Sequence, residues 1–174
     1  MIRREVRKFA ESEIVPRALE LDAAEAFSPE LTRKMGEIGL FGMFVSYAYE
    51  CQGLDYISYI IAVEEIARVD GSQAATIAAG NSLGIGPIYY FGTEEQKRRF
   101  LLPLASGEHV GAFALTEPEA GSDPSSLKTS AVKKGSAHVI NGTKQFITNG
   151  SHAGVIILIA RTSTDKNACT AFLI

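Results

Sequence analysis

The sequence predicts an α+β protein. An N-terminal all-α domain is expected over residues 1–109, followed by the start of an antiparallel β-barrel or β-sandwich domain over residues 110–174. Before Gly107 the apolar residues recur with a helical period and helix caps are frequent, whereas beyond it the period becomes two, which is typical of strands. The sequence stops within an apolar stretch at 171–174, and a sheet that ended there would present an open edge. We therefore expect the second domain to be truncated at its C-terminus.

Composition excludes several classes of protein. With 46% hydrophobic and 21% charged residues among 174, the chain is globular and not disordered. The net charge of -3 argues against a nucleic-acid-binding protein, which normally carries a basic stripe. No apolar run reaches the ~20 residues that a membrane-spanning helix needs. Cys51 and Cys169 are too few and too distant for a disulfide framework, which favours a reducing, intracellular compartment. The spacing of the three histidines predicts no metal site.

Residues 1–22 predict a first helical stretch, bent or restarted at Pro16. Its basic start could open a mitochondrial presequence, but acidic residues, which presequences avoid, favour an ordinary surface helix; they are Glu5, Glu11 and Glu13. Ser28 and Pro29 then form an N-cap and a first helical position, and Gly39 is a suitable stop.

A helix over 55–70 follows, with Glu64 and Arg68 one turn apart on its solvent side. Its apolar positions are Ile57, Ile60, Ile61, Val63 and Ala67. Residues 72–91 are helical too, with a break at Gly86-Pro87. Capping-box spacing at Thr93 predicts a last helix that ends before Pro103.

The second half predicts short strands separated by turns. Asn-Gly pairs at 141–142 and 149–150 are turn signals. The apolar run 155–160 is typical of a strand buried on both faces. The other strands are expected at 110–116, 129–134, 138–141, 144–148 and from 171 onward.

The segment 114–124 carries the chemistry. A strand ends at Thr116, and the chain turns into the small residues Ala120, Gly121 and Ser122, where a ligand can approach the backbone. Backbone N–H groups beside hydroxyls make a nest for anionic or polar ring atoms. A local interpretation is equally open, in which Ser122 or Asp123 caps a short helical turn. No P-loop, Gly-x-Ser-x-Gly elbow or Gly-x-Gly-x-x-Gly motif follows a predicted strand, so neither a hydrolase nor a Rossmann nucleotide site is supported.

Residues 116–123, Thr-Glu-Pro-Glu-Ala-Gly-Ser-Asp, resemble the flavin-binding signature of the acyl-CoA dehydrogenase family. Other stretches match the family in register, and together they cover essentially the whole chain: 80–84, 92–97, 128–129, 140–144 and 146–150. The resemblance implies an enzyme that binds FAD and oxidises an acyl-CoA thioester to its 2,3-enoyl form. The loop 45–53 departs from the family, which usually has a proline and a Tyr-Gly-Gly turn there.

The resemblance also implies site residues. The expected FAD contacts are Phe113, Leu115, Thr116, Gly121, Ser122, Phe146, Ile147 and Thr148. Phe146 stands where many relatives have tryptophan, so an aromatic wall is kept. Ser122 is expected to touch the acyl-CoA as well, and Ala79, Gly80 and Leu83 match positions along the acyl-chain pocket. The alternative for these small helical residues is tight helix packing, and both interpretations stay open.

The catalytic base is expected beyond residue 174, and Glu117 is interpreted as a scaffold residue, so the isolated chain should be inactive or nearly so. An electron-transfer flavoprotein as electron acceptor, a homotetramer, and a cytoplasmic location are implied, with the mitochondrial matrix if the source is eukaryotic. Two other functions stay open: an acyl-CoA oxidase-like enzyme that uses oxygen, and a non-catalytic helical and β binding module.

Overall fold

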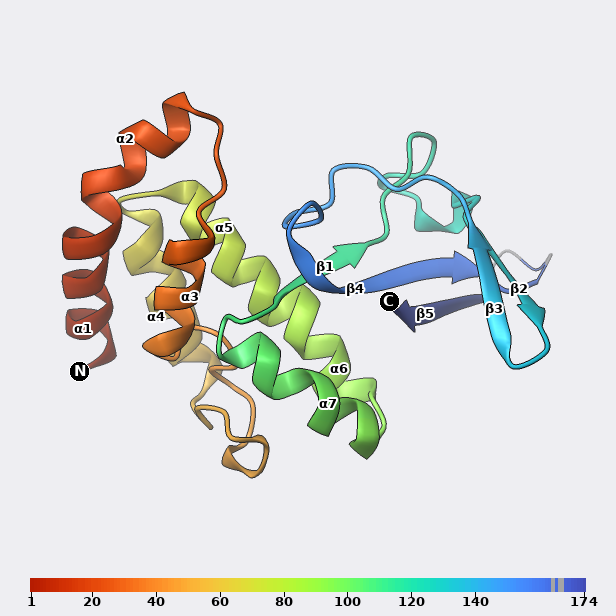
Figure 1. The fold of residues 1–174 in the computed structure, drawn as a ribbon, viewed down its shortest axis with the longest axis horizontal. Coiled ribbons are helices and arrows are strands. Elements are labelled where there is room, and N and C mark those ends of the chain that lie inside the picture. The colour runs from red at the N-terminus through yellow and green to blue at the C-terminus, as the bar shows by residue number, and fades with distance from the viewer. Residues whose placement is uncertain (164, 166–167) are drawn as a thin grey trace.

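The computed structural model describes residues 1–163, 165 and 168–174. Helices occupy the N-terminal part and a mixed sheet the C-terminal part, and the two lie end to end (Figure 1). The predicted α+β class, with a helical region followed by a sheet region, is confirmed.

The first helical stretch runs through Pro16 without stopping. Helix α1 (Ile2–Phe9) passes through a π-helical turn (Ala10–Ile14) into α2 (Val15–Ala23). Pro16 lies in the first turn of α2, where a missing N–H costs little. Helix α3 (Pro29–Glu37) begins as predicted, because the Ser28 hydroxyl accepts a hydrogen bond from the Leu31 N–H at 3.2 Å.

Helix α4 (Tyr56–Ala67) begins at the Asp55 cap but buries a different face from the expected one. Ile57 and Ile60 are 71% and 57% exposed, whereas Glu65 is fully buried. Arg68 bonds Glu65 at 3.1 Å, so the predicted pairing with Glu64 is wrong. The buried face is instead made by Tyr59, Ala62, Glu65 and Ile66.

The second helical stretch is continuous where a break was expected. Helix α5 (Gly71–Ala79) passes through a π-helical turn (Gly80–Ile85) into α6 (Gly86–Phe91). Helix α7 (Glu94–Ala105) starts at the predicted capping box of Thr93. It runs through Pro103 instead of ending before it, because burial of Leu104 and Ala105 outweighs the one backbone bond that the proline removes.

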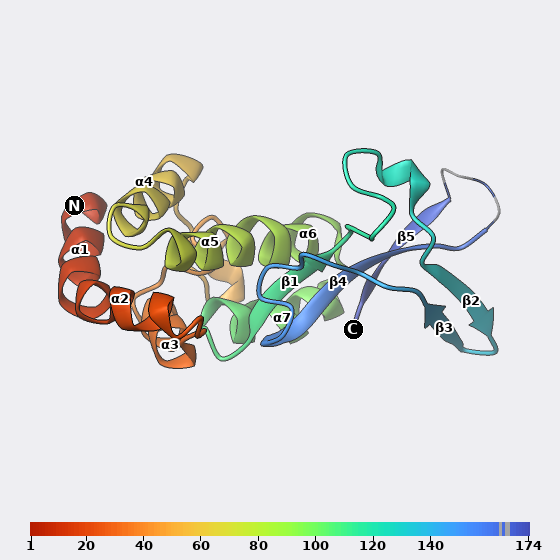
Figure 2. The same ribbon diagram turned by 90° about the horizontal axis from the view of Figure 1, so that it is seen from above.

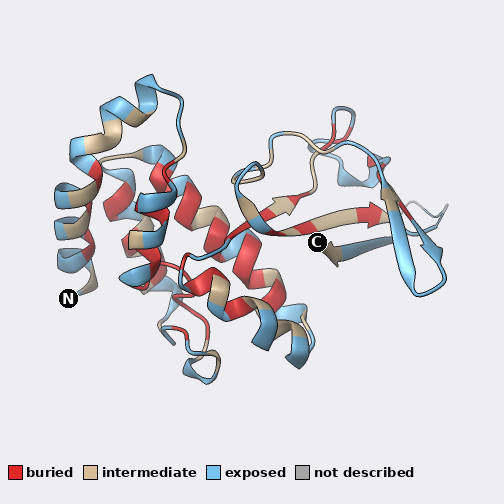
Figure 3. Cartoon of the chain, in the orientation of Figure 1, coloured by how far each residue is buried: buried red, intermediate tan, exposed pale blue. Residues whose placement is uncertain are grey.

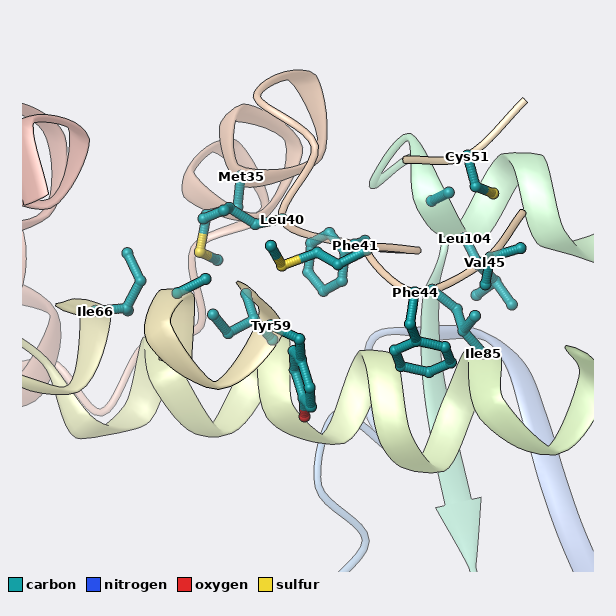
Figure 4. Packing of buried hydrophobic residues seen from close by; sticks show 14 of the residues in the cluster. Met35, Leu40, Phe41, Phe44, Val45, Cys51, Tyr59, Ile66, Ile85 and Leu104 are labelled. Carbon is teal, nitrogen blue, oxygen red and sulfur yellow. The ribbon is translucent and has the colours of Figure 1, made fainter. Parts of the chain in front are cut away.

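The main core belongs to the helical region. Side chains from the helices meet those of the link between α3 and α4 (Figure 4), including Met35, Leu40, Phe41, Phe44, Tyr59, Ile85 and Leu104. From the sheet, Val155 and Ile157 join this cluster. Burial is concentrated on the inward faces of the helices, and the outer hairpin of the sheet is largely exposed (Figure 3).

The sheet has the order β1-β4-β2-β3, with β5 also paired to β4. Its strands are β1 (Val110–Ala114), β2 (Ser130–Lys134), β3 (Ala137–Asn141), β4 (Ala153–Arg161) and β5 (Cys169–Leu173). The β2–β3 and β4–β5 pairs are antiparallel, but β1 and β4 are parallel, which corrects the expectation of an antiparallel domain. The reason is the long connection between β1 and β4, which returns the chain to the end of the sheet where β1 began.

The predicted strand at 144–148 is a loop. Phe146 has φ +57°, a left-handed conformation that no strand contains, so the ladder cannot continue through it. Residues 144–148 therefore belong to the turn-rich connection between β3 and β4, although their sequence pattern resembles that of a strand.

The helical and sheet regions meet at two glycines. A Cβ built on Gly84, in the π-helical turn, would lie 2.8 Å from the Cα of Gly111 in β1. Seen from above, β1 and β4 start beside α5 and α6 and run away from them (Figure 2). This contact places the π-helical turn next to the strand that leads into segment 114–124.

Candidate functional site

Two loops of the sheet region lie side by side. Strand β1 leads into the first loop, 115–123, and the second, 142–152, connects β3 to β4. The Gln145 N–H donates to the Thr116 carbonyl at 3.0 Å. The Asn149 side-chain amide donates to the Gly111 carbonyl at 3.3 Å. The two segments that the sequence predicts to contact a flavin are therefore brought together by the fold.

A buried ion pair ties these loops. Glu117 is 5% exposed, and its Oε1 accepts hydrogen bonds from Lys144 Nζ at 2.8 Å and from the Thr129 N–H at 3.0 Å. Its Oε2 accepts from the Lys128 N–H at 2.5 Å. Lys144 Nζ also donates to the Leu115 carbonyl at 2.9 Å.

Glu117 is held ionised. Burial alone would raise its pKa, but hydrogen bonds from the Lys128 backbone, the Lys144 ammonium and Thr129 outweigh burial and lower the pKa to about 2. A carboxylate with so low a proton affinity is a poor general base at neutral pH. The geometry thus agrees with a scaffold role for Glu117.

The predicted FAD contacts differ in exposure. Phe113, Leu115, Thr116 and Ile147 are half-buried, whereas Gly121, Ser122, Phe146 and Thr148 are exposed. Phe146 is the most unusual of them, because its side chain is 87% exposed and its backbone is left-handed. That conformation costs a non-glycine residue about 1–2 kcal/mol, and such strain gathers at functional sites. An exposed aromatic ring thus stands on the second loop, with hydroxyl groups on both.

The tip of the first loop has room for a ligand. A Cβ built on Gly121 would meet no atom within 4 Å. Asp123 caps a short 3-10 turn (Pro124–Ser126) by accepting from the Ser125 N–H at 3.0 Å. The local interpretation is therefore confirmed for Asp123, and the exposed Ser122 side chain is not the cap of that turn.

The predicted acyl-pocket residues lie where α5 widens into its π-helical turn, a feature that often marks functional sites. Ala79 is half-buried and Leu83 is 43% exposed. Gly80 is buried, and a Cβ built on it would come within 2.7 Å of the Phe41 ring, so packing alone requires a glycine there.

Asn81 is a residue that the sequence analysis missed. It is fully buried, and its Nδ2 donates to the carbonyls of Leu40 at 2.7 Å and Ile77 at 3.0 Å. Its Oδ1 accepts from the Met43 N–H at 3.3 Å. Asn81 therefore holds the π-helical turn against the core link. The sequence did contain a signal for this role, because Asn81 is a polar amide residue within a run of small and apolar helical residues.

Two other reactive residues, Cys51 and His152, are engaged in packing. Within residues 1–163, 165 and 168–174, no group of three His, Cys, Asp or Glu side chains could hold a metal ion. Burial raises the pKa of the Cys51 thiol to about 11, which makes it a weak nucleophile. The His152 ring stacks on Phe27, with centroids 4.4 Å apart. No helix in the part of the chain that the structure describes is long and apolar enough to cross a membrane.

The chain is thus an α+β protein in which a helical region precedes a mixed sheet, and an ion pair joins the two loops beside the end of β1. Residues 1–108 match the family model "Acyl-CoA dehydrogenase, N-terminal domain", and residues 112–174 match "Acyl-CoA dehydrogenase, middle domain". The chain belongs to the acyl-CoA dehydrogenase family.

Known proteins are similar to this chain along nearly its whole length. An acyl-CoA dehydrogenase of Bacillus subtilis (strain 168) is 44% identical over 176 residues, covering 100% of this chain and 46% of the relative. A structure described as the electron transferring flavoprotein of Acidaminococcus fermentans superposes with a TM-score of 0.97 at 44% identity, covering 100% of this chain and 46% of that one. The structure of a glutaryl-CoA dehydrogenase from Mycobacterium smegmatis in complex with FADH2 superposes with a TM-score of 0.94 at 34% sequence identity. This match covers 99% of this chain and 44% of that chain. The chain thus spans a little less than half the length of these relatives.

Proposed function

We propose that this chain supplies the flavin site and part of the acyl pocket of an FAD-dependent acyl-CoA dehydrogenase. The enzyme would convert an acyl-CoA thioester to the 2,3-enoyl-CoA and pass the electrons to an electron-transfer flavoprotein. One observation carries the proposal. Two loops tied by a buried ion pair present an exposed, strained aromatic residue, Phe146, together with hydroxyl groups and an open glycine.

These residues fit the chemistry of a flavin, which is a flat ring with a polar edge. Phe146 would cover one face of the ring, and Thr116, Ser122 and Thr148 would offer hydroxyls to its polar atoms. Phe113, Leu115 and Ile147 would give the half-buried, apolar part of the site, and the backbone at Gly121 would approach the phosphates. When bound, FAD supplies the acceptor for the hydride that leaves the β carbon of the substrate.

The substrate would lie between the loops and the π-helical turn. We propose that Ala79, Gly80 and Leu83 line the acyl chain and that Ser122 touches the thioester end. The contact of Gly84 with Gly111 supports this, because it sets the π-helical turn beside β1.

Removal of the α proton needs a carboxylate base. Glu117 is engaged in its ion pair and has a pKa of about 2, so we propose a base outside residues 1–174. The support is length, since the relatives are about twice as long as this chain. Residues 1–174 alone should therefore oxidise an acyl-CoA no faster than free flavin does.

The remaining parts of the proposal concern organisation. We propose a domain boundary between residues 109 and 110, a homotetramer, and a bacterial cytoplasmic location, or the mitochondrial matrix in a eukaryote. Bacterial and mitochondrial relatives support the last point. A similar structure described as an electron transferring flavoprotein supports the electron acceptor.

Titration of the chain with FAD tests the flavin site. We expect saturable quenching of flavin fluorescence, and release of FAD on denaturation. Thr148→Ala should weaken binding about tenfold, because one charge-free hydrogen bond to a buried ligand atom is worth about 1 kcal/mol or slightly more. Thr162→Ala, which removes an exposed hydroxyl just after β4 and outside both loops, is the matched control and should leave the titration unchanged. A chain that folds and takes up no FAD would overturn the proposal.

A further inference from the structure

The proposed flavin contacts are divided between two loops, so the relative position of the loops decides the shape of the site. Leu115 and Thr116 immediately precede Glu117, and Phe146 to Thr148 closely follow Lys144. Lys144 Nζ lies 2.8 Å from Glu117 Oε1, so this one contact holds together the two stretches of backbone that carry the proposed flavin contacts.

Both members of this pair make further hydrogen bonds. The Glu117 carboxylate accepts from one ammonium and two backbone N–H groups. Lys144 Nζ spans from that carboxylate to the Leu115 carbonyl. The two side chains are 4% and 9% exposed, so water contributes little to holding them. The pair therefore sets distances between three separate stretches of backbone.

Stability alone is a poor explanation for such a pair. A buried ion pair gains little over well-packed apolar side chains of the same volume, because removing two charges from water is costly. Its best attested use is to fix one register among several. At this site the register is that of loop 115–123 against loop 142–152.

We propose that Glu117 and Lys144 are positioning residues for the flavin. They would set the spacing between the ring-edge residues of the first loop and Phe146 and Thr148 on the second, without touching the cofactor themselves. The inference rests on the proposed function, because it assigns the pair a role toward the same FAD site.

A second buried carboxylate gives a matched control. Glu65 is fully buried and accepts from Arg7 at 2.8 and 3.0 Å, from Arg3 at 2.5 Å and from Arg68 at 3.1 Å. It ties helix α1 to α4, far in the sequence from both loops. Arg7→Met therefore removes a cation from a buried carboxylate, as Lys144→Met does, without touching the flavin loops.

The experiment compares Lys144→Met with Arg7→Met in FAD affinity and in amide hydrogen exchange. Lys144→Met should raise the Kd for FAD at least tenfold and speed exchange in 115–122 and 145–150. Arg7→Met should leave the Kd within twofold and speed exchange in α1 and α4. Lys144→Arg, which keeps the cation, should recover most of the affinity. Should Lys144→Met fail to fold, Glu117→Gln serves in its place, because it keeps the size of the side chain.

The outcomes separate the two proposals. If the unmodified chain binds FAD and Lys144→Met binds it equally well, the positioning role is wrong and the flavin site stands. If Lys144→Met and Arg7→Met weaken FAD binding equally, the effect is general destabilisation and the inference fails as well. If the unmodified chain takes up no FAD, the proposed function is overturned, and with it the role assigned to the pair.

Discussion

The helical region and the sheet region each bury a glutamate, and the two are held in different ways. Glu65 accepts hydrogen bonds from three arginine side chains, all on helices or at a helix end. Glu117 accepts from one lysine and from two backbone N–H groups of a loop. The first joins elements that already have their own backbone bonds. The second supplies part of the structure of the loops themselves.

The surroundings sharpen this difference. Beside Glu65, α1 and α4 are packed by the large core cluster, through residues such as Val6 and Ile66. Around Glu117, the loop residues from 121 to 126 are exposed. Loss of Glu65 should therefore weaken the fold alone, whereas loss of Glu117 should weaken the fold and also change the geometry of the site.

The largest effect is expected for Glu65→Ala. It removes the buried carboxylate that Arg3, Arg7 and Arg68 share. Loss of one partner of a buried ion pair costs about 3–5 kcal/mol, and because these arginine side chains are 44–46% exposed, water screens them and the lower end of that range is expected. Urea denaturation followed by circular dichroism measures the change. Glu64→Ala is the control: its side chain is 57% exposed, so loss of its bond to Arg3 should cost at most about 1 kcal/mol. Equal losses in the two variants would contradict this view of α1 and α4.

Next comes the pH dependence of Glu117→Gln. The pKa of Glu117 is lowered from 4.5 to about 2 in the folded chain, so its ionised form stabilises the fold above pH 4.5. At 1.36 kcal/mol per pKa unit this amounts to about 3 kcal/mol at pH 7. The contribution is lost as the pH falls toward 2. Urea denaturation at pH 7, 4 and 3 should show the gap between wild type and variant shrinking, and a constant gap would refute the argument.

A smaller effect is expected at the joint between the regions. Gly84→Ala places a Cβ 2.8 Å from the Gly111 Cα, and relief of such overpacking costs about 1–3 kcal/mol. Gly71→Ala is the control, because a Cβ there meets no atom within 4 Å and alanine favours a helix. Thermal unfolding should give a lower Tm for the first variant and an equal or higher one for the second. A tolerated Gly84→Ala would mean that the two regions are not tightly joined.

Several elements could be predicted from local chemistry alone. Ser28, Asp55 and Thr93 each begin a helix as their side chains require, and Gly39 ends one with φ +76°. These features depend on a few neighbouring residues, which the sequence displays directly. The strands at 110–114 and 153–161 follow for the same reason from their apolar alternation or run.

Features that depend on distant residues could not be predicted. The helical period of α4 gave no reason to bury Glu65 and expose Ile60, because that choice is made by arginines of α1, far earlier in the chain. Similarly, the link between Glu117 and Lys144 joins loops on either side of the β2–β3 hairpin. The flavin-contact segments themselves were identified by resemblance to a family, and the spacing of their residues left a local capping role equally open.

The smallest effect in free energy is the most informative about function. Phe146 and Glu50 both have left-handed backbones, with φ +57° and +59°. Replacing either by glycine should therefore stabilise the chain by about 1 kcal/mol, since glycine adopts this conformation without steric cost. Urea denaturation measures the gain, and FAD titration separates the two variants. Glu50→Gly, in the loop that departs from the family, should bind FAD as the unmodified chain does, whereas Phe146→Gly should lose affinity together with its aromatic wall. If Phe146→Gly became more stable and kept its affinity, the strain at this position would have no connection with the flavin.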